Sequence, residues 1–170
     1  MLDCTLMVER SARAATSADE DFLWRLYVST RASEIAAFGW PPEQQEAFLG
    51  MQYRARCGSY HAAYPQAEQR ILLENGVPAG AMIVDRNPQE IRLVDIALLP
   101  EHRNRGYGGQ EVADLIRQAE SLRLPLRLSV LLGNPAQRLY ARLGLVFKGG
   151  DGMYIEMEYA LGKNVDGISS

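Results

Sequence analysis

The feature that most constrains this fold is a basic, glycine-bearing turn between a strand pattern and a helical pattern. A largely apolar run from Ile91 to Leu99 leads into the turn and stops at Pro100. After the turn, apolar or small residues recur at helical spacing, at Gly108, Val112, Leu115, Ile116, Ala119 and Leu122. The chain is therefore expected to run strand, turn, helix at this point.

The turn has the properties of a phosphate-binding site. Glycines let a ligand approach the backbone, because no Cβ blocks the way. The first four amides of a helix lack partners within the helix, and the helix dipole adds partial positive charge there. Arg103 and Arg105 add two full charges. We therefore expect the turn to bind a phosphate group.

Two familiar phosphate-binding motifs do not fit. The dinucleotide fingerprint G-x-G-x-x-G fails because Glu111 stands where its third glycine should be. The P-loop fails because no Gly-Lys-Ser/Thr follows. What remains is the spacing Arg103-x-x-Gly106-x-Gly108 after a strand. The plain alternative is a loop whose glycines allow tight turning and whose arginines confer solubility.

Length and composition favour one soluble, cytoplasmic domain. The 170 residues, 47% hydrophobic and 23% charged, suffice for a single core. A formal charge of −3 gives no general attraction to nucleic acid or anionic membranes. No apolar run approaches the ~20 residues of a membrane span, and no signal-peptide pattern is present. Cys4 and Cys57 are read as reduced thiols, and with only His61 and His102 beside them no metal site is expected.

The N-terminal part reads as a strand and two helices. Leu6 to Arg10 is the expected strand, and Ser17-Ala18-Asp19-Glu20 has the capping-box form that opens a helix. In that helix, Trp24 lies roughly opposite the apolar stripe. Pro42 can occupy the first position of the second helix. The expected stripes are Phe22, Leu23, Leu26 and Tyr27 in the first helix and Phe48, Met51 and Ala55 in the second.

The remainder reads as antiparallel strands with one parallel crossover. Asn75-Gly76 is a strong type I′ hairpin signal, and Asn87-Pro88 turns the chain again. The helix from Gly106 to about Leu122 connects two strands, which makes a parallel crossover. The expected strands are Arg70–Glu74, Val77–Asp85, Glu90–Leu99, Leu126–Val130, Leu145–Phe147 onward and Met153–Tyr159.

A second motif lies one expected strand beyond the turn. It reads Asn134-Pro135-Ala136-x-x-Leu139-Tyr140-x-Arg142-Leu143-Gly144-Leu145, in which Asn134 can cap a short helix and Gly144 fits a left-handed helix end. Together with Arg103-x-x-Gly106-x-Gly108, it resembles the two hallmarks of the GNAT superfamily of N-acetyltransferases. Both motifs stand in the family's order, and the resemblance extends from about Arg70 to Tyr159.

The resemblance implies a GNAT-like fold, an α/β (α+β) domain whose mixed, mostly antiparallel central sheet is flanked by helices. In that fold two strands splay apart, and the pantetheine arm of coenzyme A pairs with their exposed backbone. The domain is expected to comprise residues 1–161, followed by a flexible tail at residues 162–170.

The resemblance also assigns a site for acetyl-coenzyme A. The strand end would pair with pantetheine, the turn would bind the pyrophosphate, and Asn134 would hydrogen-bond the pantetheine arm. Tyr140 would protonate the leaving thiolate. The plainer alternatives are a helix cap for Asn134 and half-buried packing for Tyr140. The expected cofactor-binding residues are Ile96, Ala97, Leu98, Leu99, Arg103, Asn104, Arg105, Gly106, Tyr107, Gly108, Gly109 and Asn134.

Two positions depart from the family pattern. Gly109 stands where many members carry serine, threonine or a longer residue, so one side-chain contact to phosphate is expected to be absent. Where members often place a base, this chain has Arg92, with Glu90 and Asp95 to either side. Asp95 lies between apolar neighbours, so burial should raise its pKa. It is the candidate base, with a structural carboxylate and a water chain as alternatives.

The sequence therefore predicts an acetyl-coenzyme A-dependent N-acetyltransferase with Tyr140 and Asp95 as catalytic residues. An amine of a small molecule or peptide would attack the thioester directly, and backbone N–H groups would stabilise the developing oxyanion. No metal, nucleic-acid partner or membrane partner is expected, and a homodimer is left open. The alternative is a module that holds an acyl-coenzyme A as a sensor without turnover.

Overall fold

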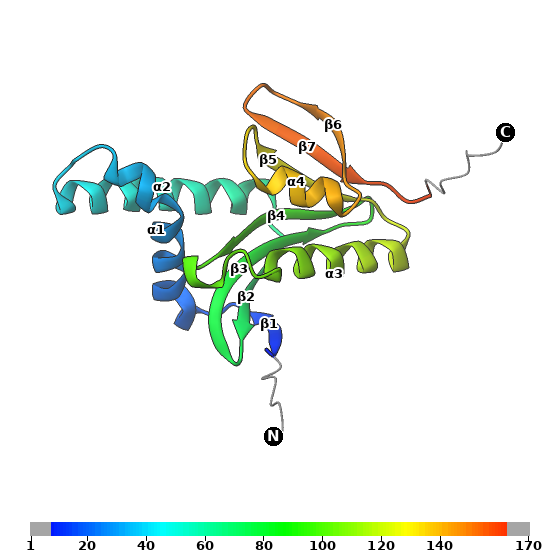
Figure 1. Ribbon diagram of the computed structural model, residues 1–170, viewed down its shortest axis with the longest axis horizontal. Coiled ribbons are helices and arrows are strands. Elements are labelled where there is room, and N and C mark those ends of the chain that lie inside the picture. The colour runs from blue at the N-terminus through cyan, green and yellow to red at the C-terminus, as the bar shows by residue number, and fades with distance from the viewer. Residues whose placement is uncertain (1–7, 163–170) are drawn as a thin grey trace, which may run out of the picture. The chain divides into compact units, whose positions relative to one another are not determined.

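The computed structural model describes residues 8–162 (Figure 1). Cys4, the first residues of the strand expected from Leu6, and the tail expected beyond Gly162 lie outside that range. The elements are β1 (Arg10–Ala14), the 3₁₀ helix η1 (Ser17–Asp19), α1 (Glu20–Ala36), α2 (Pro42–Ala63), β2 (Glu68–Glu74), β3 (Val77–Arg86), β4 (Ile91–Leu98), the 3₁₀ helix η2 (Pro100–His102), α3 (Tyr107–Leu122), β5 (Leu126–Leu131), α4 (Ala136–Arg142), β6 (Val146–Gly150) and β7 (Tyr154–Tyr159).

The strands form a seven-stranded sheet in the order β1-β2-β3-β4-β5-β7-β6. β1 pairs antiparallel with β2, and β7 pairs antiparallel with both β5 and β6. β4 and β5 are parallel, and their ladder comprises the three pairs from Ile91–Leu126 to Leu93–Leu128. The mixed, mostly antiparallel sheet with helices is the fold class that the sequence predicts.

The chain divides into two compact units. The first comprises the residues up to Ile83 together with Asp95–Arg103, and the second comprises Val84–Val94 and the residues from Asn104 onward. Each unit has its own buried side chains, because Ile71 and Leu72 are fully buried in the first, and Val112 and Leu126 in the second. The candidate site is therefore described unit by unit.

The start of α1 differs from the expected capping box by one residue. The capping box is formed by Thr16 and Asp19 instead of Ser17 and Glu20. It opens the 3₁₀ helix η1, which precedes α1. The Asp19 carboxylate accepts the Thr16 N–H at 2.8 Å and forms an ion pair with Arg13 at 2.7 Å. Both Thr16-x-x-Asp19 and Ser17-x-x-Glu20 have the spacing of a capping box. The ion pair with Arg13 stabilises the box that contains Asp19.

The buried face of α2 differs from the expected one. The helix begins at Pro42 as predicted, but Met51 is 55% exposed and Leu49 is the buried residue. The face of α2 that packs against α1 carries Phe48, Leu49 and Tyr53 instead. Trp24 and Tyr27 of α1 both pack against Tyr53, with ring centroids 5.5 Å and 5.1 Å away. α1 and α2 contact each other in the first unit (Figure 1).

The strands of the first unit carry two further local features. β1 begins at Arg10, where the expected strand ends, so that prediction is wrong in its bounds. The β2–β3 hairpin is confirmed, because Asn75 and Gly76 both have positive φ, 52° and 77°, as a type I′ turn requires. At Gly80 a Cβ would lie 2.3 Å from the Ala97 carbonyl oxygen, so β3 approaches β4 there as closely as only glycine allows.

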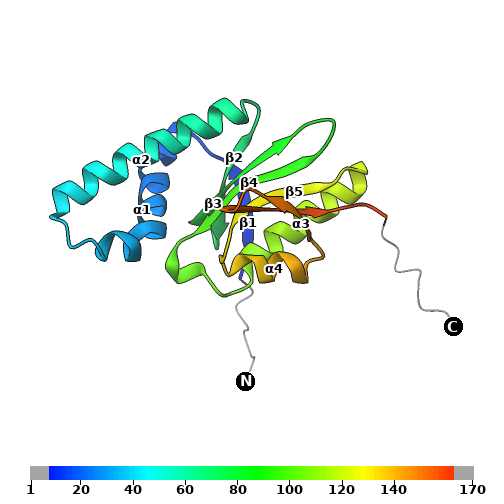
Figure 2. The same ribbon diagram turned by 90° about the horizontal axis from the view of Figure 1, so that it is seen from above.

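The second unit is built around α3. Its expected buried stripe is confirmed at Val112, Leu115 and Ala119, each no more than 1% exposed. The helix contacts β5 and α4 (Figure 2). α4 ends at Arg142, and Gly144 shortly after it has a φ of 93°, the left-handed conformation that the sequence predicts after this helix.

Candidate functional site

The phosphate turn lies between β4 and α3 and contains two left-handed residues. Asn104 has a φ of 57° and Gly106 a φ of 77°. The first backbone bond of α3 runs from Gln110 N–H to the Gly106 carbonyl at 3.0 Å. The amides of the three residues before Gln110 therefore precede the ladder of the helix, at the positive end of its dipole.

The space around these amides fits a diphosphate. A Cβ built on Gly106 meets no atom within 4 Å, so the backbone is open on that side. Tyr107 is fully buried, so its side chain anchors the start of α3. Arg105 is exposed beside the turn. Open backbone, a helix N-terminus and nearby guanidinium charge together make an anion-binding arrangement.

Gly109 has a packing reason to be glycine. A Cβ at this position would lie 3.2 Å from Leu139 Cδ1, which comes from α4. A serine or threonine here would push against that leucine. The close contact between α3 and α4 therefore accounts for the departure from the family pattern, and it was not visible from the sequence.

Two groups of the strand end already have partners within the first unit. The Leu99 N–H donates to the Ala79 carbonyl at 2.9 Å. The Arg103 Nε donates to the Leu98 carbonyl at 2.8 Å, which ties the start of the turn to the end of β4. Arg103 has a structural contact that the sequence did not indicate.

The second motif lies on and before α4. The helix begins at Ala136, and its cap residue is Pro135 rather than the predicted Asn134. Asn134 Oδ1 accepts the Ala136 N–H at 2.9 Å just before the helix. Tyr140 is only 7% exposed, more buried than the half-buried packing given as the alternative to its catalytic role. Both residues belong to the second unit, with the amides from Asn104 to Gly109, whereas Asp95 and Arg103 belong to the first.

Asp95 forms an ion pair inside the first unit. Its Oδ2 lies 2.6 Å from Nη2 of Arg56, and both side chains are partly buried. Burial raises the pKa of the Asp95 carboxyl, as expected, while the charge and hydrogen bond of Arg56 oppose the rise. For Arg56, burial alone would lower the pKa, but the charge of Asp95 and the hydrogen bonds to Tyr60 and Asp95 together outweigh burial and raise the pKa. Asp95 can therefore hold a proton more readily than a surface aspartate, next to a permanent cation.

A hollow that encloses about 40 Å³ lies beside this ion pair. Its lining residues come from α1, α2, β2, β3 and β4. Burial raises the pKa of Tyr53, which lines the hollow, to about 12, so its hydroxyl stays protonated. Several polar residues that line the hollow were not predicted from the sequence, because they belong to no motif: Arg56, Tyr53, Tyr60 and Gln69.

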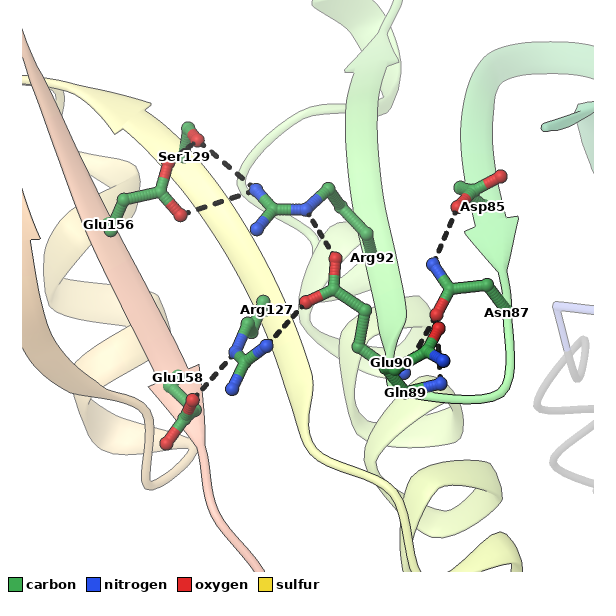
Figure 3. Close-up of polar contacts among 9 residues, drawn as sticks. All are labelled: Asp85, Asn87, Gln89, Glu90, Arg92, Arg127, Ser129, Glu156 and Glu158. Carbon is green, nitrogen blue, oxygen red and sulfur yellow. Dashed lines mark hydrogen bonds and ion pairs between the residues drawn. The ribbon is translucent and has the colours of Figure 1, made fainter. Parts of the chain in front are cut away.

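Glu90, the other carboxylate near the expected base position, belongs to a charged network in the second unit (Figure 3). Arg92 Nε and Arg127 Nη1 each donate to Glu90 at 2.8 Å. Burial would raise the pKa of Glu90, but these hydrogen bonds outweigh burial and lower it. Arg127 also donates to Glu158 at 2.7 Å, which lowers the pKa of that carboxyl. Glu90 is therefore a weaker base than an ordinary glutamate.

The network predicts a pH-dependent stability. We expect Arg127→Met to lower the free energy of unfolding by about 1–2 kcal/mol at pH 7, a modest value because the Arg127 side chain is 40% exposed. The folded pKa values of Glu90 and Glu158 lie below their unfolded values, so this stability is present above the unfolded pKa and is lost as the pH falls through the folded one.

Denaturant titrations of both proteins from pH 7 to pH 3 measure the effect. The difference between wild type and variant should shrink in the acid range. Arg117→Met is the matched control, because Arg117 pairs with Asp114 on the surface of α3 and is 68% exposed. A difference that stays constant with pH would show that Arg127 acts only by packing.

Within residues 8–162, no helix is long and apolar enough to cross a membrane. Within the same residues, no group of three or more His, Cys, Asp or Glu side chains is placed to hold a metal ion. Cys57 is a free thiol.

Solved acetyltransferases share this fold. The PaiA N-acetyltransferase from Thermoplasma acidophilum in complex with coenzyme A has a TM-score of 0.64 and 17% identity, over 89% of this chain and 99% of that chain. An acetyltransferase from Bacillus subtilis in complex with coenzyme A has a TM-score of 0.59 and 15% identity, over 91% and 99%. A GNAT family acetyltransferase from Elizabethkingia anophelis with acetyl-coenzyme A bound has a TM-score of 0.57 and 15% identity, over 89% and 98%.

The sequence comparisons give one match. No curated protein matches the sequence. The family model for the acetyltransferase (GNAT) family matches residues 21–145, which include β4, the phosphate turn, Asn134 and Tyr140. Since this match covers most of the chain and the fold agrees with it, the chain belongs to the GNAT family of acetyltransferases.

Proposed function

We propose that this protein is an N-acetyltransferase that uses acetyl-coenzyme A and acetylates an amine by direct attack. The observation that carries the proposal is the turn from Arg103 to Gly109, with open backbone at Gly106 and amides that precede the first bond of α3. Coenzyme A or acetyl-coenzyme A is bound in solved structures of the same fold. Membership in the acetyltransferase family gives no support to a non-catalytic sensor.

The turn and the strand end are the proposed binding residues. Asn104 to Gly109 would bind the pyrophosphate through backbone amides, while Ile96 and Ala97 would pair with the pantetheine amides. The short β4–β5 ladder, which comprises three residue pairs, supports such pairing. Acetyl-coenzyme A supplies an activated acetyl thioester when bound.

The proposed catalytic residues move protons. Asp95, whose pKa is raised by burial, would take the proton of the attacking amine. Tyr140, buried on α4, would donate its hydroxyl proton to the departing sulfur. The hollow around Asp95 would hold the amine, a small molecule or the end of a peptide. A single domain of residues 1–161, a cytoplasmic location and a homodimer stay predictions.

Calorimetry and a turnover assay test the function together. We expect acetyl-coenzyme A to bind in isothermal titration, and at least one member of a panel of primary amines to release thiol. The control is Asp95→Asn, which should bind acetyl-coenzyme A normally and release thiol more slowly. Tight binding without thiol release for any amine would favour the sensor, and absence of binding would refute both functions.

Arg103 should contribute to affinity by charge. We expect Arg103→Ala to weaken coenzyme A binding by about 1–3 kcal/mol, because it removes a charge-assisted contact and the bond to the Leu98 carbonyl. The loss should shrink with pantetheine, which has no diphosphate. An equal loss with pantetheine would mean that Arg103 acts only by holding the strand end.

A further inference from the structure

The hollow in the first unit contains a guanidinium held in one orientation. Arg56 Nη2 lies 2.6 Å from Asp95 Oδ2, and Arg56 Nε donates to the Tyr60 hydroxyl at 3.3 Å. The guanidinium carbon lies 5.4 Å from the Tyr27 ring centroid and 5.2 Å from that of Tyr60. Two polar partners and two aromatic faces therefore fix its plane.

This arrangement leaves part of Arg56 for a ligand. A guanidinium carries five N–H donors in a planar fork. Tyr60 takes the Nε donor and Asp95 takes one on Nη2, while the described residues provide no hydrogen-bond partner for Nη1. A carboxylate is the group whose two oxygens match such a fork. The unused edge of Arg56 therefore suits a ligand carboxylate.

The ion pair also discriminates between classes of amine. Arg56 is a permanent cation, so an amine whose other end is also positively charged would have no partner at Arg56 and would be repelled there. A zwitterion meets a complementary charge at each end, its anion at Arg56 and its amino group at Asp95. The other walls are mainly apolar, with Leu23, Leu26, Ala81 and Ile83 among them.

We infer that the acceptor is a free amino acid with an apolar or aromatic side chain, whose carboxylate binds Arg56 while its amine faces Asp95. This inference rests on the proposed acetyltransferase function and names its substrate class. In the reaction, the new bond from nitrogen to the acetyl carbon replaces the carbon–sulfur bond of the thioester. The ammonium group of the zwitterion first releases one proton to solvent. The neutral amine then loses a second proton, to Asp95, as the new bond forms, and Tyr140 gives a proton to the departing sulfur.

Matched pairs of amines test the inference. Phenylalanine and 2-phenylethylamine differ only in the carboxylate, as do leucine and 3-methylbutylamine, and tryptophan and tryptamine. We expect kcat/KM from thiol release to favour the amino acid of an accepted pair by about 10- to 100-fold, as for a charge-assisted hydrogen bond. Dipeptides that begin with the same residue should lose this preference, because their carboxylate lies further from the amine.

Arg56 variants locate the preference in the hollow. Arg56→Gln, or Arg56→Lys if the first variant does not fold, should bring the ratio within each pair close to one and leave acetyl-coenzyme A affinity unchanged. Arg54→Gln is the matched control, because Arg54 lies on the same helix, is exposed and does not line the hollow. A ratio that survives Arg56→Gln would overturn the assignment to Arg56.

A binding measurement separates this inference from the proposed function. Titration of each amine pair into protein saturated with coenzyme A needs no turnover. Preferential binding of the amino acid would support the inference even if the protein released no thiol, an outcome that would refute only the proposed function. Equal or weaker binding of the amino acid in every pair, or turnover confined to the decarboxylated amines, would overturn the inference and leave an acetyltransferase of other amines.

Discussion

Replacing Gly106 by valine is expected to weaken coenzyme A binding at least ~100-fold, since two or more charge-assisted bonds to phosphate would be lost. In the wild type a Cβ at Gly106 meets nothing within 4 Å, so the space beside the backbone is open to a ligand. A branched side chain would fill that space and keep a diphosphate from the amides of α3. Isothermal titration with coenzyme A measures the change.

Gly76→Val separates this steric effect from backbone strain. Gly76 has the same φ of 77° as Gly106, and its Cβ position is equally open, but it lies in the β2–β3 hairpin. Both variants should therefore lose similar stability from a branched residue in the left-handed region. Only Gly106→Val should lose coenzyme A affinity. A folded Gly106→Val protein with unchanged affinity would refute the proposed phosphate site.

Tyr140→Phe should slow turnover and leave binding intact. The ring remains to fill the buried space on α4, while the proton assigned to the departing sulfur is removed. General acid–base groups contribute ~10²–10⁴-fold, and we expect the fall in kcat at or just below the lower end because a thiolate leaves readily. The Kd for acetyl-coenzyme A should change by no more than about threefold, since at most one modest hydrogen bond is lost.

Tyr159→Phe is the control for loss of a tyrosine hydroxyl in the same unit. Its hydroxyl donates to Glu120 at 2.6 Å, on the exposed end of α3, and has no proposed role in catalysis. Turnover should stay at the wild-type level. Wild-type turnover in Tyr140→Phe as well would show that Tyr140 only packs, and a large loss of affinity with preserved turnover would make it a binding residue.

Local signals in the sequence predict the elements that position the phosphate turn. Asn75-Gly76 and Gly144 need positive φ, which few residues adopt, so their types alone indicate a turn and a helix end. Strand and helix periodicity places β4 and α3 within one residue of their observed bounds. The order of the two motifs then indicates the family, because each motif lies on a short contiguous segment.

Features that depend on tertiary packing could not be predicted. The Arg56–Asp95 pair joins a helix to a strand far along the chain, and no local pattern links them. The contact of Leu139 with Gly109 likewise joins two separate helices, and no local pattern links the two residues. The buried face of α2 was predicted wrongly from the helical spacing of Phe48, Met51 and Ala55. The face that is buried includes Tyr53, which contacts Trp24 of α1.

Gly80 affects both the packing of β3 against β4 and the proposed ligand site. Any larger residue would displace the Ala97 carbonyl and the adjacent Leu98 backbone, not merely a flexible side chain. Leu98 is the residue whose carbonyl holds Arg103 at the start of the turn. A substitution at Gly80 would thus disturb the proposed ligand site, although residue 80 does not contact the ligand. Gly80 is therefore fixed by the close approach of two strands, although it contacts no ligand itself.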